Sequence, residues 1–253
     1  MESKRLLIKK ERLDCISESN DYLILNEEEI HYIRRVLRLK EGSFISIIDG
    51  QGHFWKSTLI SKSTLQLHSK VENPYISLIR KKPLIKISIV PPKRGFDDFL
   101  RMSTEIGVDV IQLINSERCS SSLFNEKYMR RFHGIINEAV LQSERLWKPE
   151  LLKKIELHDL FKIKSANSLD LIAIARGKSL RLIYDINIPE VKNNNLNELA
   201  ILIGPEGGWS KGEEASAIRK GFEKVSLGNS ILKTSTAGVV ASHCLVNLRS
   251  ISN

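Results

Sequence analysis

From about residue 85 to the C-terminus, short apolar runs alternate with segments whose apolar residues recur at helical spacing. The runs are expected to be strands and the segments between them helices. Crossover connections of this kind make neighbouring strands parallel and place helices on both faces of the sheet. The sequence therefore predicts an α/β domain with a mostly parallel sheet. The expected strands are 85–90, 110–114, 169–175, 180–185, 199–203 and 224–227, and the expected helices are 96–106, 126–145, 211–220 and 236–248.

The first 73 residues have a different pattern, with short strand-like runs separated by turn residues. Asp49-Gly50-Gln51-Gly52 is a hairpin-type turn signal between two of the runs. Residues 26–39 break the pattern with apolar residues at helical spacing. A small β-barrel with one helix is expected, joined by a linker at 73–83 to a second domain at 83–253. The expected strands of the 1–73 domain are 22–25, 43–48, 54–60 and 64–71.

The charge and the cysteines limit the class of protein. The formal net charge is +9. This favours a polyanionic partner, although solubility alone is an equally good explanation of it. The cysteines, Cys15, Cys119 and Cys244, have the spacing of neither a disulfide framework nor a zinc site. Since no apolar stretch is long enough for a signal peptide or a membrane span, a cytoplasmic protein without a metal is expected.

The first segment that suggests chemistry joins the strand at 199–203 to the helix at 211–220. Three glycines, Gly204, Gly207 and Gly208, precede Ser210 and Glu213, which have capping-box spacing. Glycines let backbone amides approach a ligand closely, and a helix N-terminus favours anions. An ordinary tight turn fits the same residues. The segment lacks both the dinucleotide fingerprint and the Walker lysine, which disfavours Rossmann dehydrogenases and P-loop ATPases.

The second segment, 227–238, is again a strand end, a loop and a helix start. Ile231 and Leu232 could form the wall of an apolar slot. Three hydroxyl side chains could cap the helix or bind a ligand. They are Thr234, Ser235 and Thr236. By itself, this segment is also explained as a cluster of N-cap residues.

Together and in this order, the two segments resemble the SPOUT superfamily of knotted RNA methyltransferases. Within it they are most similar to the RsmE-type family, which methylates N3 of a uridine in small-subunit (16S) ribosomal RNA. The similar motifs are Ile203-Gly204-Pro205-Glu206-Gly207-Gly208 and the run from Leu227 to Ala237. Further similarity covers nearly the whole chain, at 92–109, Ser116-Glu117-Arg118-Cys119, Gln142-Ser143-Glu144-Arg145 and 31–38.

The resemblance implies a C-terminal trefoil-knotted domain and an N-terminal PUA-like RNA-binding β-barrel. It also implies S-adenosyl-L-methionine as cofactor, a homodimer, and ribosomal RNA in the small ribosomal subunit as partner. Cofactor binding is then expected at Ile203, Gly204, Pro205, Glu206, Gly207, Leu227, Gly228, Ile231, Leu232, Thr234, Thr236 and Ala237.

Methylation at N3 needs in-line approach of the base and removal of its proton. Glu206, Asp98 and Glu105 are candidate bases, although residues of this kind are more often structural hydrogen-bonding carboxylates than bases. The expected RNA contacts are cations that bond phosphates or stack on bases. They are Arg5, Arg34, Arg38, Lys93, Arg94, Arg118 and Arg145.

Two alternatives keep the same fold. One is a knotted methyltransferase that modifies the ribose 2′-hydroxyl of RNA. The other is a non-catalytic RNA-binding protein, which differences from the family motif at Asn229, Lys233 and Ser235 leave open.

Overall fold

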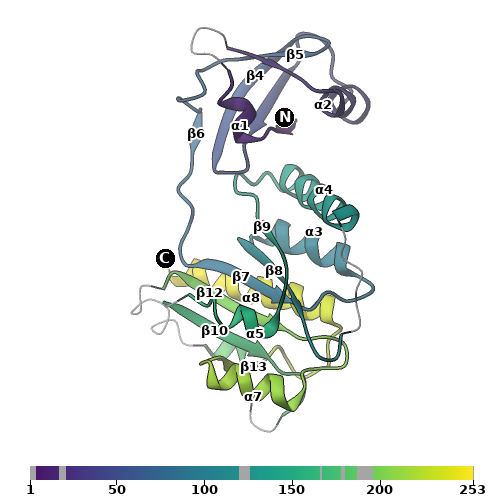
Figure 1. The fold of residues 1–253 in the computed structure, drawn as a ribbon. Coiled ribbons are helices and arrows are strands. Elements are labelled where there is room, and N and C mark those ends of the chain that lie inside the picture. Colours follow the sequence, from purple (N-terminus) through teal and green to yellow (C-terminus); the bar gives the residue numbers. More distant parts are fainter. Residues whose placement is uncertain are drawn as a thin grey trace. The chain divides into compact units, whose positions relative to one another are not determined.

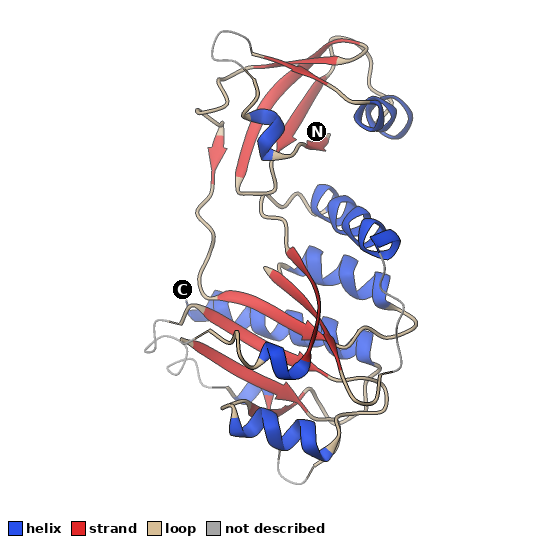
Figure 2. Ribbon diagram, viewed as in Figure 1, coloured by secondary structure: helices blue, strands red, loops and turns tan. Residues whose placement is uncertain are grey.

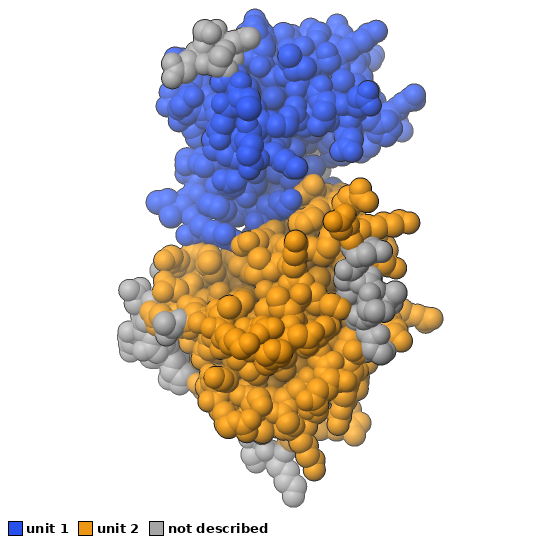
Figure 3. All heavy atoms as spheres, viewed as in Figure 1, with its two compact units in different colours: residues 1–80, 140–148 blue, residues 81–139, 149–253 orange. Residues whose placement is uncertain are grey.

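The computed structural model describes residues 4–16, 21–119, 126–165, 167–177, 180–186 and 196–252. The chain divides into two compact units, which Figure 3 distinguishes by colour. Unit 1 is Met1–Arg80 with Val140–Lys148, and unit 2 is Lys81–Ala139 with Pro149–Asn253. The return of the chain to unit 1 at Val140–Lys148 has no counterpart in the sequence-based domains 1–73 and 83–253, which remain a prediction.

Unit 1 is built on a six-stranded sheet (Figures 1 and 2). Along the sheet the strands are β1 (Arg5–Leu7), β3 (Phe44–Ile48), β4 (His53–Ser61), β5 (Thr64–Leu67) and β2 (Tyr22–Ile24), and β6 (Ile76–Ser77) pairs with β4. The four expected strands are present, and the one expected at 64–71 ends at Leu67. Strands β1 and β6 and helix α1 (Lys10–Leu13) were not expected. Strand β6 lies within the segment predicted to be a linker.

The predicted helix of unit 1 begins where expected. The Asn26 side chain accepts from the Glu29 backbone, and the Glu29 carboxylate accepts from the Asn26 N–H, which together form a capping box. Helix α2 (Glu27–His31) continues as the π-helix η1 (Tyr32–Val36) and stops short of the expected residue 39. Arg38 follows with a positive φ of 53°. The buried side chains Ile33, Trp55 and Leu59 form the centre of the unit's core.

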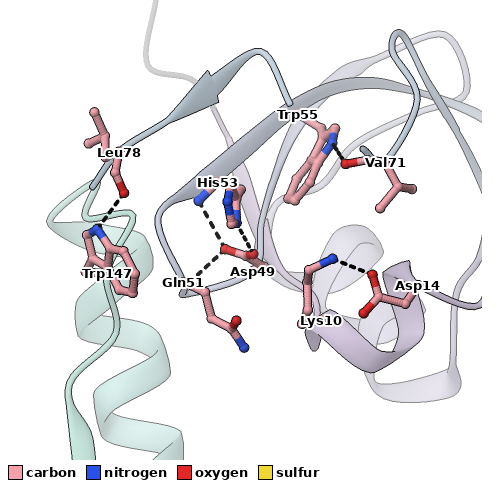
Figure 4. A network of polar contacts seen from close by, with 9 residues as sticks. All are labelled: Lys10, Asp14, Asp49, Gln51, His53, Trp55, Val71, Leu78 and Trp147. Carbon is pink, nitrogen blue, oxygen red and sulfur yellow. Dashed lines mark hydrogen bonds and ion pairs between the residues drawn. The ribbon is translucent and has the colours of Figure 1, made fainter. Parts of the chain in front are cut away.

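The turn between β3 and β4 is confirmed, and Asp49 organises it (Figure 4). The buried Asp49 carboxylate accepts from the Gln51 N–H at 2.7 Å and the His53 N–H at 3.1 Å, and its other oxygen lies 2.6 Å from Nδ1 of His53. An aspartate that bonds the backbone after it is typical of tight turns.

Unit 2 contains a seven-stranded sheet in which every pairing is parallel, as predicted. The strand order is β11 (Arg181–Leu182), β13 (Glu223–Ser226), β10 (Ser168–Ala173), β12 (Glu198–Ile203), β7 (Leu84–Ile89), β8 (Val110–Asn115) and β9 (Glu150–Glu156). Edge strand β9 was not expected. The strand expected at 180–185 is shorter, because after β11 the chain turns into the 3-10 helix η2 (Ile183–Asp185).

Helices cover both faces of this sheet (Figure 1). Helix α8 (Thr234–Ser252) packs on β7 and β12 and against α3 (Phe96–Ile106). On the other face, α5 (Leu157–Leu160) and α7 (Lys211–Arg219) bury Leu160 and Ala217 in a cluster with Ile172 and Leu202. Helix α4 (Glu126–Gln142) packs beside α3, where the rings of Phe132 and Phe96 are 4.9 Å apart. The four long helices predicted from the sequence are confirmed, with ends shifted by up to four residues. Of the helices described, none is long and apolar enough to cross a membrane.

A buried ion pair fixes the C-terminal end of α8. The Arg249 guanidinium donates to the Asp109 carboxylate, and both side chains are less than one-tenth exposed. Arg249 also donates to the carbonyls of Pro83 and Gly107, and Asp109 accepts from the Ile85 N–H. The pair therefore connects the end of α8 to the residues that precede β7 and β8.

A second charged pair lies at the start of the parallel strands. Glu198 of β12 is 3.5 Å from Lys86 of β7. Burial raises the pKa of Glu198 above its ordinary value of 4.5 and the nearby Asp170 adds to the rise, while Lys86 opposes it. The pKa of Glu198 is therefore higher in the folded protein than in the unfolded chain. The contribution of Glu198 to the free energy of unfolding is complete below pH 4.5 and is lost as the pH rises through the folded-state pKa.

Glu198→Gln is expected to remove this pH dependence. The variant should gain stability relative to the natural chain as the pH rises above the ordinary glutamate pKa of 4.5, since the glutamine has no charge to desolvate. Urea unfolding at several pH values measures the difference. Parallel pH profiles for the two proteins would contradict the prediction.

Candidate functional site

Unit 2 contains a cavity of about 540 Å³ at the carboxyl ends of β10, β12 and β13. Its size is within the range of small-molecule sites, roughly 300–1,000 Å³. Ligands of parallel α/β sheets bind outside the carboxyl ends of the strands. The lining residues are Arg118, Ala173, Ile174, Ala175, Arg176, the run Ile203 to Trp209, Glu214, Ser226, Leu227, Gly228, Ser230, Ile231, Leu232, Thr234 and Ala237.

The first wall is the loop that follows β12. A Cβ atom at Gly204 would lie 2.9 Å from Cε2 of the Trp209 ring, closer than side chains can approach. The Trp209 indole N–H donates to the Ala173 carbonyl at 3.1 Å. The indole therefore lies against Gly204 and connects the end of β12 to the end of β10. Glycine at position 204 is required by this close approach.

The helix behind this loop begins with the predicted capping box. The Glu213 N–H donates to Oγ of Ser210 at 3.1 Å, and the Ser210 N–H donates to the Glu213 carboxylate at 2.8 Å. The buried Glu213 also accepts from the Glu117 N–H at 2.9 Å. Arg118 donates to the Gly207 carbonyl at 2.9 Å. The loop after β8 is thus hydrogen-bonded both to α7 and to the loop after β12 that contains Gly204 and Gly207.

The second wall is the irregular segment between β13 and α8. Gly228 has a φ of +142°, a conformation that side-chain-bearing residues rarely adopt. The Ser226 hydroxyl donates to the Gly228 carbonyl at 2.9 Å and closes the turn. Beyond it, Ile231 is exposed and Leu232 is half-buried at the cavity. These two side chains give the cavity an apolar wall, as the sequence predicted.

A side chain from α8 connects the two loops. The hydroxyl of Thr234, the first residue of α8, donates to the Gly204 carbonyl at 3.1 Å and is buried. A fixed distance between the loops preorganises the cavity for a ligand.

The residues predicted for the cofactor lie together at this cavity, with one exception. All of them line it except Thr236. Thr236 follows Thr234 by two helical positions, about 200° around the helix axis, and is exposed to solvent. The sequence analysis missed the contribution of Ala173 to Arg176. These residues could have been suspected from the sequence, because they follow or end the strand expected at 169–175. The carboxyl ends of parallel strands lie at one edge of the sheet, where ligands bind.

Of the three candidate bases, only Glu206 lines the cavity. Asp98 and Glu105 lie on α3, where Arg101 is 3.5 Å from Asp98 and 3.3 Å from Glu105. These surface pairs within one helix are typical of structural carboxylates. The prediction that Asp98 or Glu105 serves as the base is therefore not supported by their positions in this chain.

The predicted RNA contacts are distributed over both units. Arg118 lines the cavity, and Lys93 and Arg94 are exposed in the turn before α3 of unit 2. In unit 1, Arg5 pairs with Glu144 at 2.9 Å and Arg34 lies 3.5 Å from Glu41. Arg38 and Arg145 are also in unit 1. Within the described ranges, no group of His, Cys, Asp or Glu side chains could hold a metal ion.

Comparison with known proteins links the fold to a family. A family model described as RNA methyltransferase domain matches residues 80–246, and one described as RNA methyltransferase PUA domain matches residues 25–72. Ribosomal RNA small subunit methyltransferase E from Synechocystis sp. is 32% identical over 225 residues, covering 86% of this chain and 70% of the relative. The protein of the same name from Rickettsia conorii is 27% identical over 242 residues, covering 90% and 94%.

Solved structures show the same fold. The Neisseria gonorrhoeae ribosomal RNA small subunit methyltransferase E, crystallised with bound S-adenosyl methionine, superposes with a TM-score of 0.78. The two chains are 24% identical, and the match covers 97% of this chain and 98% of the other. This similarity establishes the architecture of both units.

Proposed function

Since this chain belongs to the family of RNA methyltransferases, we propose that it transfers a methyl group from S-adenosyl-L-methionine to N3 of a uridine in 16S ribosomal RNA. The observation that carries the proposal is the cavity between the two glycine loops, which Thr234 joins through the Gly204 carbonyl. The names of the relatives from Synechocystis sp. and Rickettsia conorii support the ribosomal RNA of the small subunit as substrate.

The residues of the cavity fit an adenosine-containing cofactor. Ile231 and Leu232 provide an apolar surface for an adenine ring, and the backbone around Leu227, Ile231 and Leu232 provides donors and acceptors for its edge. The end of β10 also lines the cavity, with Ala173 and Arg176 among its residues. The bound cofactor would supply an electrophilic methyl group on its sulfonium.

The side chains of the cavity then position the base and remove its proton. In this proposal Arg118, which donates to the Gly207 carbonyl, also binds a phosphate or base of the RNA. Glu206 is the candidate to accept the N3 proton, since the other carboxylate at the cavity, Glu214, is paired with Lys224 at 2.5 Å. Geometric positioning supplies much of the rate, because the methyl group must be attacked in line.

We further propose that residues 1–73 are an RNA-binding PUA-like domain and that residues 83–253 form the knotted catalytic domain. The match of residues 25–72 to a PUA domain model supports the first part. In this proposal the protein acts in the cytoplasm as a homodimer on the small ribosomal subunit.

Methylation of purified small subunits and of naked 16S RNA with labelled cofactor tests the function. The RNA should come from a strain that lacks the gene, and digestion followed by mass spectrometry identifies the modified nucleoside. The expected product is N3-methyluridine. A ribose 2′-O-methyl product would favour the ribose-modifying alternative, and no methylation of either substrate would favour the non-catalytic one.

A further inference from the structure

Unit 1 exposes an apolar segment at and after β6. Tyr75 is 62% exposed, Ile79 is 94% exposed, and the side chains of Ile76 and Leu78 between them are also exposed. Four large apolar side chains exposed within five consecutive residues are uncommon on a soluble surface and mark an interaction site. Arg80, Lys81 and Lys82 follow directly in the sequence.

Cations lie over the aromatic rings of this part of unit 1, of which Tyr75 is exposed and Phe54 is buried. Nζ of Lys56 is 3.5 Å from the centroid of the Tyr75 ring, and the Arg5 guanidinium is 5.7 Å from the Phe54 ring. The Phe54 and Tyr75 rings are themselves neighbours, 6.1 Å apart. The guanidinium of Arg80 lies 5.3 Å from the Trp147 ring. We call this surface the aromatic strip; it consists of Arg5, Phe54, Lys56, Tyr75, Ile76, Leu78, Ile79, Arg80 and Trp147.

The backbone of the strip is held in place by unit 1. The Trp147 indole N–H donates to the Leu78 carbonyl at 3.1 Å, as Figure 4 shows, and the Leu78 N–H donates to the Gly52 carbonyl at 2.9 Å. Ile76 pairs with Phe54 in the sheet. Rings that are fixed before binding lose little conformational entropy when a ligand stacks on them.

We propose that the aromatic strip binds single-stranded RNA, with a base stacked on the exposed ring of Tyr75 and phosphates held by Lys56 and Arg80. Alternating rings and cations are the means by which proteins bind unpaired RNA, because every base has a face that can stack. The charged members of the strip are cations, of which Arg5 is paired with Glu144. The positive charges of Lys56 and Arg80 favour RNA over a protein partner as occupant. The inference rests on the proposed function, for which it names a second RNA contact besides the methylation cavity.

Fluorescence anisotropy with a fluorescein-labelled 12-nucleotide oligouridine tests the strip. Tyr75→Ala is expected to weaken binding about 5-fold or more, since stacking on one aromatic side chain contributes about 1–3 kcal/mol. Tyr75→Phe keeps the ring and should stay within about 2-fold of the natural chain. Tyr22→Ala is the matched control, because Tyr22 is an exposed tyrosine of the same unit outside the strip. Lys56→Gln should reduce the slope of log affinity against log salt by about 0.7.

Calorimetry with S-adenosyl-L-methionine on the same variants separates this inference from the proposed function. Cofactor affinity should be unchanged in Tyr75→Ala, because the cavity is formed by residues of unit 2. Equal RNA affinity of Tyr75→Ala and the natural chain would overturn the inference and direct attention to a protein partner for the exposed edge of β6. Equal losses in Tyr75→Ala and Tyr22→Ala would also overturn it. Absence of cofactor binding in the natural chain would count against the proposed function alone.

Discussion

Gly204→Ala is expected to raise the dissociation constant for S-adenosyl-L-methionine by about 30- to 150-fold. The added Cβ atom would lie 2.9 Å from Cε2 and 3.0 Å from Nε1 of the Trp209 indole, so the ring or the loop must move. Either movement disturbs the cavity wall and the Gly204 carbonyl that Thr234 bonds. A displaced loop would lose the equivalent of about two hydrogen bonds to the cofactor, roughly 2–3 kcal/mol, which corresponds to that loss of affinity.

Isothermal titration calorimetry measures the effect, and Gly134→Ala is the matched control. Gly134 lies exposed on α4, and a Cβ atom there would meet no atom within 4 Å. The control should bind the cofactor normally and be slightly more stable, because alanine favours helix by about 1 kcal/mol over glycine. In a Trp209→Ala background the extra methyl group at position 204 should cost less, since the ring that it meets is absent. Unchanged affinity in Gly204→Ala would mean that the ligand lies elsewhere.

Arg249→Leu is expected to lower the free energy of unfolding of unit 2 by about 3–5 kcal/mol. Removing one member of a buried ion pair leaves the other charge uncompensated, and that penalty is of this size. Asp109 is the charged group left behind, and its carboxylate still accepts from the Ile85 N–H. The end of α8 also loses its bonds to the carbonyls of Pro83 and Gly107. Chemical denaturation followed by circular dichroism measures the loss.

Two further variants test whether the uncompensated charge of Asp109 causes the loss of stability. Arg219→Leu removes an exposed arginine whose side chain bonds Ser216 on the same helix, and should change stability by less than about 0.5 kcal/mol. Adding Asp109→Asn to Arg249→Leu should restore part of the stability, because the amide oxygen can still accept from Ile85 without carrying a charge. A loss below about 1 kcal/mol in Arg249→Leu would show that the pair is dispensable.

The parallel sheet of unit 2 was predictable because its central strands are rich in large aliphatic residues, even where polar residues such as Lys86 and Ser88 of β7 alternate with them. Ile85, Ile87 and Ile89 on β7, for example, are fully buried, and no polar position interrupts the run at 199–203. Strand β9 at the edge was not predictable, since its sequence Glu-Leu-Leu-Lys-Lys-Ile-Glu is half polar and half exposed. Strand β6 has two residues, both exposed, and carries no alternation to detect.

The parts of the candidate site that depend on neighbouring residues in the sequence were predictable. Gly204 and Gly228 shape the backbone of their own loops, and Ser210 with Glu213 caps the helix that they precede. Contributions from distant parts of the chain were missed. Ala173 reaches the cavity because β10 lies beside β12, and strand order is not visible in a single sequence. The same limit applies to Trp147, which joins unit 1 after the chain has passed through unit 2.

The positions of Arg and Lys in the sequence were a poor guide to which cations contact RNA. Charge alone did not distinguish Arg5, which pairs with Glu144 and lies over Phe54, from Arg118, which lines the cavity. The aromatic neighbours of Lys56 and Arg80 make these two residues candidates for RNA contacts, and this requires knowledge of β6 and Trp147. Cation positions depend on tertiary contacts that the sequence pattern does not specify.

The most direct test of the central claim is a crystal structure of the protein grown with S-adenosyl-L-methionine. We expect density for the adenine against Ile231 and Leu232, with the methyl-bearing sulfur directed toward the side of the cavity where Arg118 and Glu206 lie. Density at another place in the chain, or a cavity that stays closed to the cofactor at millimolar concentration, would contradict the account.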